Sequence, residues 1–154
     1  MTNFPAERDD RLRTAAYTPH EHGPVGSLEE AAQLRGVEPG AIIKTMLIRR
    51  AEDDYLFVLV PGDRVIDWPK LREVLGERRL SMPDADEALD VTGYVRGTIT
   101  PFASKRQLPV VADAIVSGKT VSIGAGDHGK SLTIAGDELI RVLDATVADV
   151  TTEK

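Results

Sequence analysis

Short apolar runs alternate with polar turns along this chain, and this spacing is typical of strands that pair as hairpins. Residues 41–48 (AIIKTMLI) and 55–60 (YLFVLV) are rich in β-forming residues and are joined by a charged turn, so they predict one hairpin. A second hairpin is predicted around the turn-like residues 126–129. The further predicted strands are 107–112, 120–125, 131–135 and 145–150.

Capping residues mark the helices between these strands. Ser27 and Glu30 have the spacing of a capping box, and Gly36 is placed to end the helix that follows. Further helices are predicted from Asp67 to Gly76, over residues 84–89, and from Asp137 through Leu143. Hairpins outnumber strand–helix–strand units. This favours an α/β (α+β) fold with a mixed, largely antiparallel sheet, or a partial barrel, and flanking helices.

The sequence also predicts how the chain is organised. No linker, repeat or low-complexity tract divides it, so residues 1–154 predict a single domain, with residues 1–13 as a loose arm or a short helix. The charged segment 7–11 stands where a secretory signal needs an apolar core, and no apolar run approaches the roughly 20 residues of a membrane helix. We therefore expect a cytoplasmic protein with no membrane partner. Its oligomeric state is left open.

Composition narrows the chemistry. Among 154 residues, 19 Lys+Arg face 25 Asp+Glu, and the net charge of −6 disfavours a broad phosphate-binding surface while leaving room for a local basic face. The absence of cysteine excludes a disulfide, a thiolate metal site and a cysteine nucleophile. The three histidines, His20, His22 and His128, lack the carboxylate pattern of a metal centre, so no metal or cofactor is expected.

Residues 124–131 (GAGDHGKS) match the P-loop pattern of nucleotide-binding proteins. A P-loop must open a helix, however, because the helix N-terminus faces the phosphates. Residues 131–135 instead alternate with a period of two and are followed at once by Gly136, which indicates a strand. The segment therefore predicts a hairpin turn, with nucleotide binding as the weaker hypothesis.

Lys44 is the most informative single residue, because strand alternation leaves its ammonium among apolar neighbours on whichever face it lies. An unpaired buried ammonium costs several kcal/mol or loses its proton. Two interpretations stay open at this point. The lysine stem lies on apolar surface with its head in water, or the head faces an anionic or carbonyl group of a ligand in a pocket.

Two other features are candidates for a site. Residues 92–102 contain two glycines and Pro101, which predict an irregular loop whose backbone can approach a ligand closely, or simply a long surface crossover. Asp113 ends an apolar strand and is either a cap or turn residue or an acid. No nucleophile paired with a base stands out from the sequence.

At these positions the sequence resembles the YbaK/ProX (YbaK/EbsC) family of aminoacyl-tRNA deacylases, which is related to the editing domain of prolyl-tRNA synthetase. The resemblance runs from about His22 to the C-terminus. It rests on 22–24 (HGP), 43–45 (IKT), 60–63 (VPGD), 92–94 (TGY), the loop 97–101, 108–110 (LPV) with Asp113, and 126–129 (GDHG). It implies a mixed α/β domain that hydrolyses the ester of a mischarged tRNA, without a protein nucleophile.

The resemblance also implies the site. Lys44 is the expected catalytic residue, binding the tRNA terminal phosphate or stabilising oxyanion charge, and the backbone of loop 97–101 lines the aminoacyl pocket. The expected substrate-binding residues are His22, Thr45, Gly97, Thr98, Ile99, Thr100, Pro101, Phe102, Asp113 and Ser131. Phe102 is expected to narrow the pocket, and a basic rim is expected around Lys44.

The expected substrate is a small amino acid, Cys or Ala, on tRNA(Pro). The hints conflict: Lys44-Thr45 resembles cysteine-specific members, whereas Ser131 stands where some of those members carry aspartate. Expected partners are the acceptor end of a mischarged tRNA and prolyl-tRNA synthetase or another synthetase. The alternative is a non-catalytic relative that binds tRNA, a synthetase or a small ligand in the same pocket.

Overall fold

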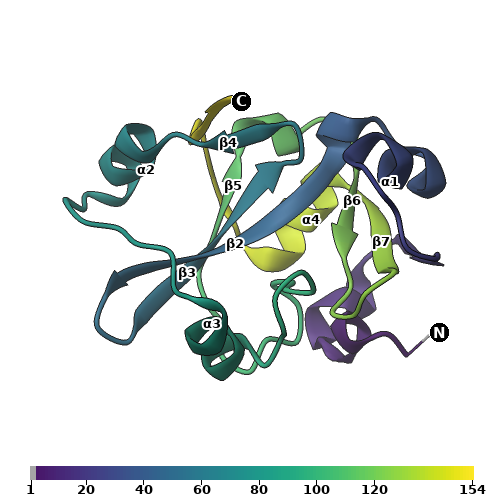
Figure 1. Ribbon diagram of the computed structural model, residues 1–154, viewed down its shortest axis with the longest axis horizontal. Helices are drawn as coiled ribbons and strands as arrows, with labels where there is room; N and C mark the ends of the chain where they lie inside the picture. Colours follow the sequence, from purple (N-terminus) through teal and green to yellow (C-terminus); the bar gives the residue numbers. More distant parts are fainter. Residues whose placement is uncertain (1–2) are drawn as a thin grey trace.

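The long hairpin predicted at residues 41–60 forms the centre of the protein. In the computed structural model, which describes residues 3–154, β2 (Ile42–Ala51) pairs antiparallel with β3 (Asp54–Pro61). β3 is buried on both faces along almost its whole length, which explains its unbroken apolar run. Figure 1 shows this hairpin crossing the whole molecule.

Around the hairpin lies a seven-stranded sheet in the order β1-β7-β6-β2-β3-β5-β8, and β4 pairs with β9 separately. Pairing is antiparallel for β1–β7, β6–β7, β2–β3 and β4–β9, and parallel for β2–β6, β3–β5 and β5–β8. The longest ladders are antiparallel, so the predicted mixed, largely antiparallel sheet is confirmed. The remaining strands are β1 (Tyr17–Glu21), β4 (Arg64–Ile66), β5 (Val110–Asp113), β6 (Thr120–Gly124), β7 (Lys130–Ala135), β8 (Thr146–Ala148) and β9 (Thr151–Glu153).

Four α-helices flank the sheet in the described part of the chain: α1 (Leu28–Arg35), α2 (Trp68–Leu75), α3 (Ala85–Thr92) and α4 (Gly136–Leu143). The predicted caps of the first three are confirmed, since Ser27, Asp67 and Asp84 each accept a backbone N–H three residues on. Gly36 and Gly76 end their helices with positive φ, as predicted. The carboxylate of Glu30, however, accepts from the backbone N–H of Gly26 rather than that of Ser27.

The predicted cap of α4 is wrong. Ala135 occupies the N-cap position because β7 runs directly into the helix. Asp137 instead lies in the first helical turn, where its Oδ1 accepts from the Ser117 hydroxyl at 2.6 Å and from the backbone N–H of Gly118 at 3.2 Å. The residue therefore fastens the preceding loop to the helix.

The N-terminal segment is not a loose arm in its described part, and residues 1–2 lie outside the described residues. It forms two 3₁₀ helices, η1 (Pro5–Arg8) and η2 (Asp10–Thr14). Phe4 and Leu12 are both buried in the main core, and the Ala6 N–H donates to the Ala125 carbonyl at 2.9 Å. These contacts hold the segment against the β6–β7 turn, beside which it lies in Figure 1.

Two apolar clusters lie on the two faces of the β2–β3 hairpin. The main core includes Ile43, Leu47 and Phe57, and the smaller one includes Ile48, Val58 and others from β3, α2 and the C-terminal segment. This alternation puts Lys44 on the face of the smaller cluster and Thr45 on that of the main core.

The segment that matches a P-loop is a hairpin, as predicted. β6 and β7 pair antiparallel with Gly124 opposite Ser131, and residues 130–135 form a strand rather than a helix. The side chain of Lys130 pairs with Asp127 of the same turn at 3.0 Å. Within residues 3–154, no helix is long and apolar enough to cross a membrane.

Candidate active site

A cavity of about 620 Å³ opens where two neighbouring strands separate. β2 and β6 pair only at Ile42 and Ile43, and the next contact on this edge of β2 is the bridge between Arg49 and Ser81. α3 and the loop after it, which lie below β2 in Figure 1, form the opposite wall. The lining residues are Arg35, 42–47, 82–85, Ala88, Arg96, Gly97, Ile99 and Gly124.

The unpaired edge of β2 presents backbone hydrogen-bonding groups to this cavity. The Ile42 carbonyl accepts from Gly62 on the β3 side, whereas the Arg49 N–H donates to Ser81 on the other side. Because these directions alternate along a strand, the N–H and C=O groups of Thr45 and Leu47 point away from β3, toward the cavity. Backbone groups need partners, so a ligand bound here can complete the strand edge.

Thr45 adds a polar side chain to the same wall. Its Oγ1 is buried and has no hydrogen-bond partner among the described residues. Buried hydroxyls are normally satisfied, so this enclosed oxygen beside the cavity is an exception. Thr45, which the resemblance predicts to bind substrate, therefore lies in the lining of the cavity.

Lys44 lines the cavity and is half-buried. Its Nζ donates to the Arg64 carbonyl of β4 at 2.9 Å. Burial lowers the pKa of Lys44, the positive charge of Lys154 lowers it further, and Asp63 opposes both. The fold thus holds the Lys44 ammonium on a backbone carbonyl of β4, and Asp63 is the carboxylate whose charge favours it.

The loop 92–102 contributes in two ways. Gly97, which has a φ of +87°, and Ile99 line the cavity. Other residues hold the loop in place. The N–H and the hydroxyl of Thr98 both donate to the Val95 carbonyl, and the Pro101 carbonyl accepts from Arg11. Thr100 is fully buried with no partner for its Oγ1 among the described residues.

Phe102 does not narrow the cavity. It is fully buried in the main core, its carbonyl accepts from the Tyr94 hydroxyl at 2.6 Å, and the Arg11 guanidinium lies 5.9 Å from its ring centroid. The buried Phe102 side chain therefore anchors the C-terminal end of the loop 92–102.

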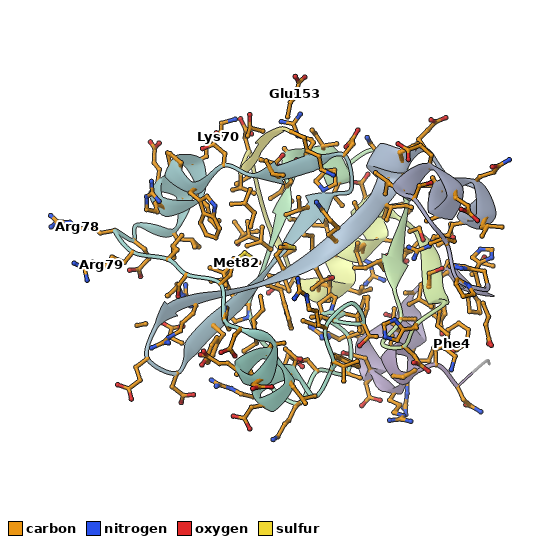
Figure 2. All side chains as sticks on the ribbon, in the orientation of Figure 1. Phe4, Lys70, Arg78, Arg79, Met82 and Glu153 are labelled. Carbon is orange, nitrogen blue, oxygen red and sulfur yellow. The ribbon has the colours of Figure 1, made fainter. Side chains whose placement is uncertain are left out.

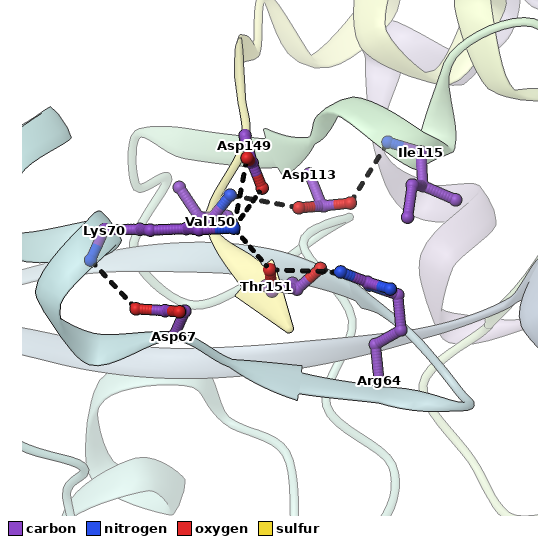
Figure 3. Close-up of polar contacts among 8 residues, drawn as sticks. All are labelled: Arg64, Asp67, Lys70, Asp113, Ile115, Asp149, Val150 and Thr151. Carbon is purple, nitrogen blue, oxygen red and sulfur yellow. Dashed lines mark hydrogen bonds and ion pairs between the residues drawn. The ribbon is translucent and has the colours of Figure 1, made fainter. Parts of the chain in front are cut away.

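Asp113 is a cap rather than a cavity residue. Its Oδ2 accepts from the Ile115 N–H at 3.0 Å, capping the 3₁₀ helix η4 (Ala114–Val116), and its Oδ1 accepts from the Val150 N–H at 3.1 Å. Figure 3 shows it between these two segments, near the Lys70–Asp149 pair. Of the two interpretations left open by the sequence, the geometry fits the cap.

His22, Ser131 and His128 lie near the cavity without being part of its lining. His22 contacts Arg35, and Ser131 is fully buried opposite Gly124, with no partner for its Oγ among the described residues. A Cβ on Gly97 would lie 3.4 Å from Cε1 of His128. The sequence predicts a hairpin turn at residues 126–129, and the structure brings His128 of this turn beside Gly97 in the loop 92–102.

Two cations that line the cavity, Arg35 and Arg96, were not among the site residues expected from the sequence. Arg35 reads as an ordinary charge in the last turn of a helix, and Arg96 reads as one of several scattered cations. With Lys44 they face a single lining carboxylate, Asp84. Other cations lie away from the cavity: Arg106 pairs with Asp53 at 2.7 Å, and Figure 2 shows Arg78 and Arg79 projecting from the molecule at one end.

Within residues 3–154 no group of three or more His, Asp or Glu side chains is arranged to hold a metal ion. The cavity instead offers cations, backbone donors and acceptors, and apolar side chains. This combination suits a ligand with an anionic part and a small uncharged part.

The fold is that of an editing domain of the YbaK type. The chain belongs to the family described as "Aminoacyl-tRNA editing domain", which matches residues 22–142. The family makes it an aminoacyl-tRNA hydrolase, as the resemblance implied. A solved structure described as a proposed trans-editing enzyme for prolyl-tRNA synthetase superposes with a TM-score of 0.83, at 24% identity, over 96% of this chain and 97% of that one.

Two relatives by sequence differ in architecture. EbsC of Enterococcus faecalis, a proposed Cys-tRNA(Pro)/Cys-tRNA(Cys) deacylase, is 26% identical over 129 residues, covering 83% of this chain and 79% of EbsC. The proline–tRNA ligase of Thermosipho melanesiensis is 35% identical over 107 residues, covering 70% of this chain but only 18% of the ligase. The chain therefore spans about a fifth of such ligases and most of EbsC.

The cap assignment of Asp113 makes a prediction. Asp113→Ala removes the η4 cap and leaves the buried Val150 N–H without a partner, so the free energy of unfolding should fall by about 2–4 kcal/mol. Urea unfolding measures this, with Ser27→Ala as the control that loses an exposed cap, for about 1 kcal/mol. Ester hydrolysis by the folded variant should stay within twofold of wild type. Loss of activity at unchanged stability would instead place Asp113 at the substrate.

Proposed function

We propose that this protein hydrolyses the ester of a mischarged tRNA in trans, and that the cavity along β2 receives the aminoacylated 3′ end. The observation that carries the proposal is the unpaired β2 edge, with Lys44 and Thr45, facing Gly97 and Ile99 across one cavity. An aminoacyl ester is an activated substrate, so positioning it beside a water molecule supplies much of the rate acceleration.

The cavity has a group for each part of such a substrate. The inward-facing carbonyl of Thr45 can accept from the α-ammonium group, and inward N–H groups of the β2 edge can donate to the ester carbonyl. Water adds to the carbonyl carbon, negative charge develops on its oxygen, and the bond to the ribose oxygen breaks. The proton lost by the water ends on that ribose oxygen. The charge of Lys44 stabilises the oxyanion or holds the terminal phosphate.

A small uncharged amino acid fits this arrangement best. Ile99, Leu47 and Ala88 give the lining an apolar surface against which a small side chain can pack. We propose Cys or Ala on tRNA(Pro) as the substrate; the name of EbsC supports Cys, and similarity to proline–tRNA ligases supports tRNA(Pro). Ser131 and His22 are proposed to shape the part of the site next to Arg35 and Gly124. The proposed partner is the acceptor end of tRNA, with or without a synthetase.

A panel of charged tRNAs tests the function. The wild-type protein is incubated with Cys-, Ala-, Ser- and Pro-tRNA(Pro), and ester loss is followed against a protein-free blank. We expect hydrolysis of Cys- or Ala-tRNA(Pro) at least 100-fold faster than that of correctly charged Pro-tRNA(Pro). RNA binding without hydrolysis of any ester would overturn the enzymatic proposal in favour of a non-catalytic binder.

A further inference from the structure

Arg35 brings a positive charge to the cavity that no carboxylate neutralises. The residue is half-buried in the last turn of α1, and its two hydrogen-bond partners are both neutral: Nε donates to His22 Nε2 and Nη1 donates to Ser122 Oγ, each at 3.3 Å. No ion pair joins it to a carboxylate within residues 3–154. Burial alone lowers its pKa, and a cation in this position favours an anionic partner.

The two neutral contacts orient the guanidinium. His22 Nδ1 lies 3.1 Å from the Gly23 carbonyl, so a neutral ring with its proton on Nδ1 satisfies both this contact and the one from Arg35. Ser122 is fully buried in β6 and fixes the other end of the fork. Nη2 makes no hydrogen bond to any described residue, so it stays available for a ligand.

We propose that Arg35, held by His22 and Ser122, binds a phosphate group of the tRNA 3′ end; this inference rests on the proposed function. A small amino acid esterified to tRNA carries an α-ammonium group and no negative charge, so the anions of the substrate are its phosphates. A guanidinium fork matches a phosphate geometrically, and it remains charged at any working pH. Arg35 therefore positions the RNA, while the aminoacyl group lies along β2.

Arg35 also lies at a suitable place along the cavity. It marks one end, near Ile42 and Gly124 where β2 and β6 meet, whereas Ala85 and Ala88 of α3 lie at the other. Arg96, an exposed residue of the glycine loop, lines the same cavity and adds to the positive potential. The negative body of the protein thus contains a local cationic path for a single RNA strand.

Binding of uncharged RNA tests this inference without any catalysis. The probe is a fluorescent acceptor-stem minihelix of tRNA(Pro) with its CCA end, titrated at several KCl concentrations against wild type, R35Q, R35K and R13Q. Arg13 is the matched control, because it is exposed and its one ion pair among residues 3–154 is with Asp10, at 3.2 Å. Circular dichroism confirms that each variant is folded.

R35Q should bind about tenfold more weakly than wild type, and its plot of log K against log[KCl] should be shallower by about 0.7–0.9, the loss of one phosphate contact. R35K should keep the wild-type slope and recover part of the affinity, and R13Q should match wild type. On a minihelix that lacks the CCA nucleotides, wild type and R35Q should bind equally.

Three outcomes overturn the inference: a wild-type slope in R35Q, an R35K variant that binds no better than R35Q, or the same R35Q defect on both RNAs. Failure of the proposed function looks different. It is a wild-type protein that hydrolyses no mischarged tRNA, and the binding measurement does not depend on that result.

Discussion

Replacing Lys44 with methionine should lower kcat/KM for ester hydrolysis by about 10²–10³-fold while the protein stays folded. Methionine keeps an apolar stem on the face of β2 that carries the smaller cluster, but removes the positive charge of a residue that lines the cavity. Removing one electrostatic stabiliser of a developing oxyanion has an effect of this size. Single-turnover hydrolysis of Cys- and Ala-tRNA(Pro) measures the change.

Whether the substitution changes kcat or KM assigns the role of Lys44. A loss confined to kcat indicates oxyanion stabilisation, and a rise in KM at constant kcat indicates a phosphate contact. Lys44→Arg keeps the positive charge, so its kcat/KM should be more than tenfold higher than that of Lys44→Met. Lys119→Met, at an exposed lysine away from this cavity, should leave kcat/KM within twofold of wild type. An active Lys44→Met variant would remove the residue from the mechanism.

The elements of this fold were predictable because their signals are local. Ser27, Asp67 and Asp84 cap helices through contacts three residues away, and the hairpins are joined by short turns. The cap prediction at Asp137 was wrong because this residue lies two positions after the N-cap, where its carboxylate binds the loop at Ser117. The parallel pairs β3–β5 and β5–β8 join distant segments, and no local pattern encodes them.

The cavity was predictable only in part, for a related reason. Lys44 stood out as a cation in an apolar strand and the loop 92–102 through its glycines, whereas Thr45, Gly97 and Ile99 were expected from the family resemblance. Arg35 was not, since its importance lies in lacking an acidic partner, and a sequence shows charges but not their pairing. The position of His128 beside Gly97 likewise depends on how two distant turns pack.

Whether the glycine loop acts through its backbone can be tested at Gly97. Gly97 has a φ of +87°, so alanine there is strained by about 1–2 kcal/mol, and its Cβ would lie 3.4 Å from His128 Cε1. That distance is at the short limit of ordinary van der Waals contact, so the loop shifts because its strained φ relaxes rather than because of a clash. Displacing a wall that positions the ester should lower kcat/KM by about 10–100-fold.

Gly118→Ala separates this effect from backbone strain. Gly118 has a φ of +81°, so alanine there carries the same strain, but no atom lies within 4 Å of the added Cβ and the residue does not line the cavity. Urea unfolding should therefore show similar losses of stability in both variants, whereas hydrolysis of Cys- and Ala-tRNA(Pro) should fall only in Gly97→Ala. Equal activity in the two would mean that the loop is a surface crossover, the other interpretation that its sequence left open, and that the β2 edge alone positions the ester.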